Sequence, residues 1–211
     1  MNTMEIKNLI LDMGGVILDV DYKKIFLEFV KYDCNDMQSF FTQQKQIPLV
    51  DDFEKGLITP AVFREEVRKL IGKNLEDRVL DDIWNSMVLG VRKEDVELIK
   101  VLRKKYDKVF LFSNTNEIHV EYVKAMFFEV MGYDVFETLF DKVYFSNERH
   151  LRKPDEESFE FVVEDAGVEK EATMFIDDTE KNILGAERVG LKTYLLDNNQ
   201  TLTQIFNKGI I

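Results

Sequence analysis

The sequence predicts an α/β fold, in which a doubly wound parallel sheet carries an inserted all-helical cap subdomain. Along most of the chain, short apolar runs alternate with amphipathic helical patterns, and one long stretch of helical patterns interrupts that alternation. Strands that alternate with helices are typical of a parallel sheet covered by helices.

Five apolar runs predict the strands. Each run is too short for a helix and shows no alternation with polar residues, which indicates a strand buried on both faces. The runs are Ile6–Leu11, Val109–Phe112, Val143–Phe145, Met174–Ile176 and Tyr194–Leu196.

Helical periodicity predicts one helix between the third and fourth runs and another between the fourth and fifth. The first has Pro154 near its start and Gly167 where a left-handed cap would lie, and the second lies between Thr179 and Gly190. Their apolar faces comprise Phe159, Val162, Val163 and Ala166 in the first helix, and Ile183, Ala186 and Val189 in the second.

The segment between the first two strands is predicted to form the cap. Residues 20–90 show helical patterns and no strand-like run, and about 70 residues are far too many for a loop. In one helix, Thr59 is the expected N-cap and Pro60 a first-turn residue. The apolar stripe of that helix comprises Val62, Phe63, Val67, Leu70 and Ile71, and the cap core is expected to include Phe40, Phe41, Phe53 and Phe63.

These patterns divide the chain into two parts. We expect a Rossmann-like α/β core domain at residues 1–18 and 91–211, and a helical cap at residues 19–90. Short hinges near residues 17–22 and 88–93 are expected to join them.

Composition narrows the class of protein. The 211 residues include 40 acidic and 28 basic side chains, giving a net charge of −12, which argues against nucleic acid or an anionic membrane as partner. The lone Cys34 excludes an internal disulfide and a Cys-rich zinc module. The sequence shows neither an 18-residue apolar run nor a signal-peptide pattern. We therefore expect a soluble cytoplasmic protein, either a monomer or a weak homodimer.

Polar residues follow four of the predicted strands. Asp12 follows the first, Ser113 and Asn114 the second, and Asp177 and Asp178 the fourth, while the segment 151–155, which contains a lysine, comes after the third. Because the working site of a parallel sheet lies beyond the carboxyl ends of its strands, these groups should converge. Carboxylates suit Mg²⁺, and hydroxyl, amide and ammonium donors suit a phosphoryl group.

Each of these features alone has an ordinary structural interpretation. An Asp or Asn after a strand is most often a turn former or a helix cap, and a lysine is usually solvated. Asp177 and Asp178 could be a solvated pair, although two like charges after a buried strand cost energy unless a cation lies there. All four interpretations would have to hold together, so we favour a metal and phosphate site.

In four segments the chain resembles the haloacid dehalogenase superfamily of phosphohydrolases, and the resemblance spans essentially the whole length. The segments are LILDMGGVILDVD (9–21), VFLFSNTN (109–116), LRKPD (151–155) and MFIDDTEKNILGA (174–186). The first is most similar to the bacterial branch that includes small sugar-phosphate phosphatases.

The resemblance implies a role for each matching residue. Asp12 would be the nucleophile that becomes an aspartyl-phosphate, and Lys153 would balance charge. Ser113 and the amide of Asn114 would hold phosphoryl oxygens. The resemblance also implies the metal site, in which Asp12, the Gly14 carbonyl and Asp178 would bind Mg²⁺ directly, Asp177 would bind it through water, and Asn182 would orient the acidic pair.

Gly14 departs from the superfamily pattern. Most of its phosphatases carry a second Asp at this position, as general acid and then base, and such assistance is worth roughly 10²–10⁴-fold in rate. Here another group, such as Asp19, Asp21 or a cap residue, supplies the proton, or the substrate has a good leaving group. An anomeric sugar phosphate is the first substrate that this reasoning suggests.

Three functions are therefore weighed. The first is a Mg²⁺-dependent phosphatase of small phosphorylated metabolites, a phosphoric monoester hydrolase. The second is an inactive or weak metal- and phosphate-binding regulatory protein, which the missing acid would explain. The third is a haloacid dehalogenase, which needs no metal and no acidic pair such as Asp177 and Asp178.

The cap is expected to select the substrate. Trp84, Asn85 and Met87 lie on the last helical pattern before the second hinge and are candidates to face the site, with Trp84 the candidate substrate-binding residue. The alternative, that Trp84 and Met87 pack the cap core, is at least equally well founded. His119 and His150 are left out of the chemistry because the sequence shows no partner for either.

Overall fold

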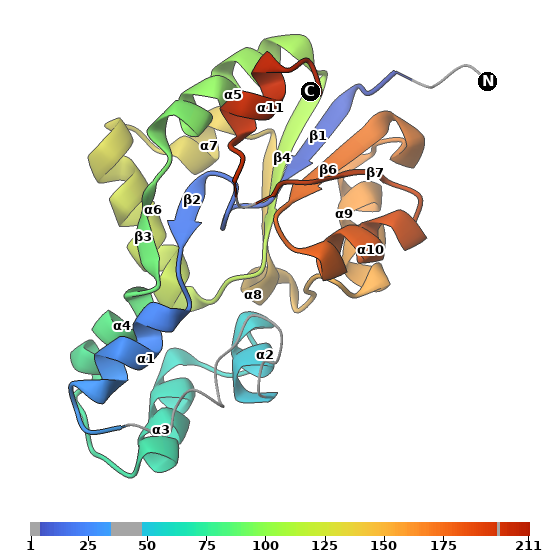
Figure 1. Ribbon diagram of the computed structural model, residues 1–211. Helices are drawn as coiled ribbons and strands as arrows, with labels where there is room; N and C mark the ends of the chain where they lie inside the picture. Colours follow the sequence, from blue (N-terminus) through green and yellow to red (C-terminus); the bar gives the residue numbers. More distant parts are fainter. Residues whose placement is uncertain (1–4, 35–47, 198) are drawn as a thin grey trace.

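The computed structural model describes residues 5–34, 48–197 and 199–211, and its centre is a five-stranded parallel sheet (Figure 1). Its strands lie in the order β5-β4-β1-β6-β7. The bounds are β1 Asn8–Leu11, β4 Lys108–Ser113, β5 Lys142–Phe145, β6 Thr173–Asp177 and β7 Lys192–Leu195. All five runs predicted as strands are confirmed as strands of one parallel sheet. The edge strand β7 is only partly buried, which differs from the expectation of burial on both faces.

Alternate residues of the central strands enter two separate apolar clusters. Leu9 and Leu11 belong to one cluster and Ile10 to the other, because successive side chains of a strand point to opposite faces. The helices that cover the sheet are α5 Lys93–Lys105, α6 Glu117–Met131, α7 Val135–Leu139, α9 Glu156–Ala166, α10 Glu180–Arg188 and α11 Leu202–Asn207. Two short helices lie in the connections, α8 (Ser146–Arg149) directly after β5 and η2 (Lys170–Ala172) directly before β6. The predicted faces of α9 and α10 pack in the second cluster.

The segment between β1 and β4 forms the cap helices at one end of the molecule (Figure 1). They are α1 Lys23–Val30, α2 Pro48–Glu54, α3 Pro60–Ile71 and α4 Asp77–Asn85. The predicted N-cap of α3 is confirmed, since the Thr59 side chain accepts a hydrogen bond from the backbone N–H of Val62 at 3.4 Å. Phe53 and Phe63 stack in the cap core with ring centroids 4.2 Å apart. Phe40 and Phe41 lie outside the described residues.

Two details of the cap differ from the sequence expectation. Val62 and Leu70 are 45% and 40% exposed, because the apolar stripe of α3 is wider than the face that packs inward. The segment is also not purely helical. Strands β2 (Leu18–Val20) and β3 (Val88–Val91) pair antiparallel, so the two expected hinges form one ribbon. The division at residues 18/19 and 90/91 stays a prediction.

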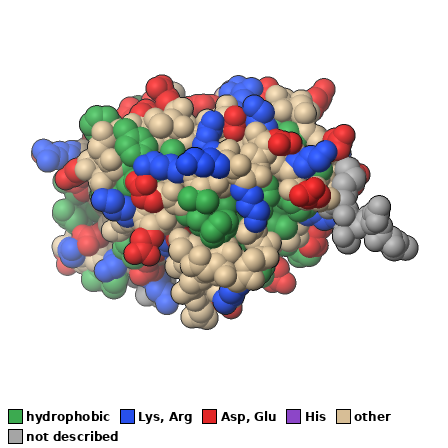
Figure 2. Space-filling model, turned by 90° about the horizontal axis from the view of Figure 1, so that it is seen from above, with side chains coloured by type: hydrophobic (Ala, Val, Ile, Leu, Met, Phe, Trp, Pro, Cys, Tyr) green, Lys and Arg blue, Asp and Glu red, His purple; other side chains and the backbone are tan. Residues whose placement is uncertain are grey.

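Charged side chains of both signs lie on the surface. Acidic and basic side chains are both present over the face shown in Figure 2. None of the helices within the described ranges combines the length and apolar character that crossing a membrane requires.

Candidate active site

A pocket of about 60 Å³ lies at the carboxyl ends of β1, β4 and β6, between the core and the cap. The strand ends bring the predicted residues together there, as the parallel topology requires. The pocket is lined by Asp12, Gly14, Val20, Tyr22, Glu54, Ser113, Asn114, Arg152, Lys153, Asp178, Thr179, Lys181 and Asn182.

Three carboxylates form an acidic cluster at the base of the pocket. Oxygens of Asp12, Asp177 and Asp178 all lie within 4.8 Å of one another. Asp12 and Asp177 are buried, at 8% and 0% exposure. Such a cluster is costly without positive charge nearby, because each carboxylate loses hydration and repels the others.

Lys153 supplies one positive charge. Its Nζ lies 2.7 Å from Asp12 Oδ1, donates to Asp177 Oδ2 at 2.7 Å, and donates to the Phe112 carbonyl oxygen at 2.9 Å. The three N–H groups of the ammonium therefore each have an acceptor. The side chain is 1% exposed, which excludes the alternative of a solvated surface lysine.

Asn114 fixes the backbone of this lysine. Its Oδ1 accepts from the Lys153 backbone N–H at 2.9 Å, and its Nδ2 donates to the Lys153 carbonyl oxygen at 2.8 Å. Ser113, the last residue of β4, is 2% exposed and lines the pocket. Ser113 and Asn114 thus both lie beside the nucleophile candidate, and the Asn114 side chain has a structural task that the sequence did not reveal.

Asp177 accepts hydrogen bonds from two residues that follow it closely in the sequence, Thr179 and Asn182. The Asn182 Nδ2 lies 3.1 Å from each oxygen of Asp177, and the backbone N–H of Thr179 donates to Oδ1 at 2.8 Å. The Thr179 hydroxyl donates to Asp178 Oδ1 at 3.0 Å. These contacts orient the acidic pair and match the supporting position expected for Asn182.

The electrostatics of the cluster show incomplete neutralisation. Burial raises the pKa of Asp12 to about 8, with Asp177 and Asp178 adding to the rise and Lys153 opposing it. Burial and Asp177 likewise raise the pKa of Asp178. Although burial lowers the pKa of Lys153, the attraction of Asp12 and Asp177 raises it overall. One ammonium beside three carboxylates leaves negative charge that a divalent cation would balance.

The two glycines after Asp12 have different reasons to be glycine. Gly15 has φ +72°, and a Cβ there would lie 2.1 Å from Asp178 Oδ2, so any side chain would displace the Asp178 carboxylate. A Cβ at Gly14 would meet only the Val20 methyls, at 3.7 and 3.8 Å, which is ordinary contact. The backbone therefore does not require glycine at position 14.

The structure does not place Trp84 with these residues. Its ring is 5% exposed and stacks on His119, with centroids 5.2 Å apart, and its Nε1 donates to Asn116 Oδ1 at 3.3 Å. These contacts hold α4 against the start of α6, away from the pocket lining. The prediction that Trp84 binds substrate is not supported by this placement, and the alternative of a packing role is.

His119 belongs to the same contact. Its Nε2 lies 3.1 Å from the Trp84 carbonyl oxygen, which can only accept, so Nε2 carries the proton and Nδ1 accepts from Asn116 Nδ2 at 3.0 Å. Burial lowers the pKa of His119 to about 4. The ring is therefore a neutral structural group.

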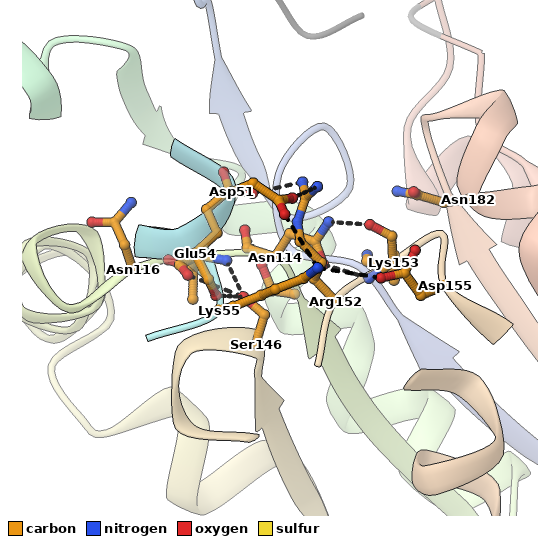
Figure 3. A network of polar contacts seen from close by, with 12 residues as sticks. Asp51, Glu54, Lys55, Asn114, Asn116, Ser146, Arg152, Lys153, Asp155 and Asn182 are labelled. Atoms are coloured by element: carbon orange, nitrogen blue, oxygen red, sulfur yellow. Dashed lines mark hydrogen bonds and ion pairs between the residues drawn. The ribbon is translucent and has the colours of Figure 1, made fainter. Parts of the chain in front are cut away.

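Four polar residues of the pocket lining had no role in the sequence analysis. Tyr22 comes from the linker before α1 and Glu54 from the end of α2, while Arg152 and Lys181 come from the core. Figure 3 shows Glu54 and Arg152 in one network of ion pairs beside Lys153. Arg152 and Lys181 adjoin the predicted Lys153 and Asn182, and that adjacency was the available signal for them.

Comparison with known proteins places the chain in a family. A family model described as haloacid dehalogenase-like hydrolase matches residues 6–190. The chain belongs to the haloacid dehalogenase-like hydrolases. This confirms the resemblance, and it makes the protein a hydrolase.

Relatives of this hydrolase match over nearly the whole chain. It is 30% identical over 206 residues to a D-ribitol-5-phosphate phosphatase from Bacteroides thetaiotaomicron, covering 96% of this chain and 99% of the relative. A HAD family enzyme from Bacteroides thetaiotaomicron, solved as an aspartate-to-alanine mutant in complex with magnesium and inorganic phosphate, matches with a TM-score of 0.90 and 36% identity, covering 95% of this chain and 98% of that one. A predicted HAD-like family hydrolase from Porphyromonas gingivalis matches with a TM-score of 0.87 and 29% identity, covering 97% and 98%.

Proposed function

We propose that this hydrolase is a Mg²⁺-dependent phosphatase of small sugar or sugar-alcohol phosphates, with Asp12 as its nucleophile. The observation that supports this most is the acidic cluster of Asp12, Asp177 and Asp178 beside the buried Lys153. A structural relative binds magnesium and inorganic phosphate as an aspartate-to-alanine mutant, which fits the same chemistry.

The donor set fits Mg²⁺. Asp12, Asp178 and the main-chain carbonyl of Gly14 would hold the ion, Asp177 would act through water, and all the donors are oxygens, as this hard cation prefers. When bound, Mg²⁺ supplies positive charge that offsets the repulsion between a carboxylate nucleophile and a phosphoryl group.

The chain's own residues then account for two displacement steps. An Asp12 oxygen bonds to phosphorus, the bond from phosphorus to the ester oxygen breaks, and the alcohol leaves with a proton. Water next attacks phosphorus, giving inorganic phosphate and restoring the Asp12 carboxylate. Lys153 stabilises the charge on the nucleophile and phosphoryl oxygens, and Ser113 and the Asn114 amide donate to those oxygens.

The proton for the leaving oxygen has no source at Gly14. Asp19 forms an ion pair with Arg92 at 2.6 Å, and Asp21 accepts from the backbone N–H of Lys23; neither lines the pocket. Of the groups considered from the sequence, a cap residue is the one that the geometry supports, since Tyr22 and Glu54 do line it.

The comparison also bears on the substrate. The missing acid suggested an anomeric sugar phosphate, whereas D-ribitol 5-phosphate, the substrate named for one relative, is an ester of a primary alcohol. We therefore include sugar-alcohol phosphates in the proposal. The small pocket between core and cap favours such substrates over phosphorylated proteins.

Two other functions stay as alternatives. Gly14, which offers no general acid, is the observation behind the alternative of a catalytically weak or inactive metal- and phosphate-binding regulatory protein. A haloacid dehalogenase is disfavoured, because its reaction has no use for the clustered carboxylates Asp177 and Asp178.

Phosphate release from p-nitrophenyl phosphate and D-ribitol 5-phosphate tests the proposal. We expect turnover that requires Mg²⁺, is abolished by chelator, and falls at least roughly 10⁴-fold in Asp12→Asn. Folded protein that binds Mg²⁺ and turns over neither substrate would instead establish the regulatory protein. Turnover that persists with chelator would contradict the metal assignment.

A further inference from the structure

The part of the pocket beyond the acidic cluster is lined by four polar groups that neither attack the phosphoryl group nor bind its oxygens in the proposed steps. Tyr22 and Glu54 reach it from the cap, and Arg152 and Lys181 reach it from the core. A phosphate held at Asp12 and Lys153 would place its leaving group against these four side chains.

Glu54 and Arg152 belong to an ion-pair network that extends beyond the pocket lining (Figure 3). Arg152 Nη2 lies 2.6 Å from Glu54 Oε2, and its Nη1 lies 2.6 Å from Asp51 Oδ1. Lys55 lies 3.1 Å from Asp51 and 3.6 Å from Asp155. The Arg152 guanidinium is thus ion-paired with two carboxylates of α2, those of Asp51 and Glu54.

The formal charges of these groups cancel. Arg152, Lys55 and Lys181 are basic, and they balance three acidic side chains, which are Asp51, Glu54 and Asp155. Burial and the positive charge of Arg152 lower the pKa of Lys181, against the attraction of nearby carboxylates. A second anionic group on a substrate would lose its hydration here without gaining a net countercharge.

Hydroxyl groups fit the same surroundings well. Glu54 is a carboxylate acceptor, Arg152 and Lys181 are donors, and Tyr22 carries a hydroxyl. The Tyr22 side chain is partly exposed and lines the pocket, and its hydroxyl forms no hydrogen bond with the part of the chain that the structure describes. A hydroxyl with no such bond can donate to a ligand in the pocket.

We propose that Tyr22, Glu54, Arg152 and Lys181 form a leaving-group subsite for an uncharged polyhydroxylated chain, which discriminates against substrates with a second anionic group. This inference rests on the proposed phosphatase function. It assigns selection of the leaving group to Tyr22 and Glu54, whereas the sequence pattern pointed to Trp84.

The test compares kcat/KM for three phosphate monoesters. D-ribitol 5-phosphate has an uncharged hydroxylated chain, phosphogluconate has a similar chain with a carboxylate, and methyl phosphate has no hydroxyl group to bind. We expect the wild-type protein to prefer D-ribitol 5-phosphate over phosphogluconate by at least about 10-fold.

Glu54→Gln removes one negative charge from the subsite and keeps the shape of the side chain. The network then carries a net positive charge, so the preference for D-ribitol 5-phosphate over phosphogluconate should shrink by about 10-fold. Asp52→Asn is the matched control, because it removes the same charge from α2 at a residue outside the pocket lining. The preference of Asp52→Asn for D-ribitol 5-phosphate over phosphogluconate should stay within about twofold of wild type.

Tyr22→Phe leaves every ion pair in place, so it tests the subsite even if Glu54→Gln fails to fold. We expect its kcat/KM to fall about 10-fold for D-ribitol 5-phosphate and much less for methyl phosphate. Equal losses on both substrates in Tyr22→Phe, or an unchanged preference in Glu54→Gln, would overturn the subsite. The phosphatase would still stand if p-nitrophenyl phosphate turnover continued to need Asp12, and it would fall with the subsite if no substrate were turned over.

Discussion

The core side and the cap side of the pocket are built by different means. On the core side, Asp12, Ser113 and Asp177 lie at the ends of buried strands, so the pairing of the parallel sheet positions them. On the cap side, Tyr22 and Glu54 stand at the beginning and end of helices, and their reach depends on how the cap is seated. The strand ends belong to the hydrogen-bonded sheet, whereas the two helix ends on the cap side lie outside it. This difference suits fixed chemistry on one side and adjustable selectivity on the other.

After loss of the nucleophile itself in Asp12→Asn, Lys153→Met gives the largest effect expected on the core side. Removal of the ammonium leaves Asp12 and Asp177 without their shared partner, so kcat should fall roughly 10²–10³-fold. The loss should be the same for D-ribitol 5-phosphate and methyl phosphate, because Lys153 acts on the phosphoryl group. Steady-state kinetics on both substrates provides the measurement.

Lys104→Met, on the exposed end of α5, serves as the control for Lys153→Met. A similar loss in both variants would show that Lys153 has no special role. A loss confined to D-ribitol 5-phosphate would erase the distinction between the two sides of the pocket.

The two glycines after Asp12 sharpen the comparison within the core side. Gly15→Ala should destabilise the fold by about 1–2 kcal/mol, from the positive φ, and should displace Asp178. We expect the Mg²⁺ concentration for half-maximal activity to rise at least about 10-fold, since Asp178 is a proposed ligand. Gly14→Ala should change this concentration far less, because its Cβ meets only ordinary contacts. Activity titrations with Mg²⁺ on the two variants decide the point, and matching curves would contradict it.

The smallest effect concerns the cap–core contact outside the pocket. His119 is neutral in the fold because burial lowers its pKa to about 4, whereas an unfolded histidine titrates near 6.5. The unfolded chain therefore binds the extra proton first, and stability that is complete above pH 6.5 declines as the pH falls toward 4. This histidine should cost roughly 1.3 kcal/mol between pH 7.5 and pH 5.5.

Urea denaturation of wild type and His119→Gln at those two pH values isolates the histidine contribution. The variant should be less stable at both values, since it loses the contacts to Trp84, but it should show a smaller decline between them. Identical declines would mean that His119 is not the group responsible.

Much of the core side could be predicted from sequence for a physical reason. Buried strands need apolar residues on both faces, so Asp12, Ser113 and Asp177 stand out as the first polar residues after such runs. Lys153 was indicated from the residues only by its place after the third strand, and its role in balancing charge came from the family resemblance. The burial of Lys153 and the two hydrogen bonds between its backbone and the Asn114 side chain are visible only in the structure.

The cap side was less predictable because periodicity does not fix orientation. A helical pattern states which residues share a face, but it does not state which neighbour that face meets, so Trp84 was expected at the pocket and lies against His119. Strands β2 and β3 are too short to give an alternating pattern, and Gly90 weakens the second. Tyr22 was not predicted to line the pocket, because it lies in the linker after this ribbon, where no periodic pattern marks it.

The ribbon of β2 and β3 has a consequence for how such a protein diversifies. Leu18 pairs with Val91 and Asp19 with Gly90, so both ends of the cap leave the core at neighbouring rungs of one ladder. A replacement segment needs only to begin and end on two adjacent, antiparallel strands, while every strand of the parallel sheet keeps its partners. Exchange of the segment between β2 and β3, in evolution or by protein engineering, can therefore replace the cap and leave the carboxylates of the acidic cluster in place.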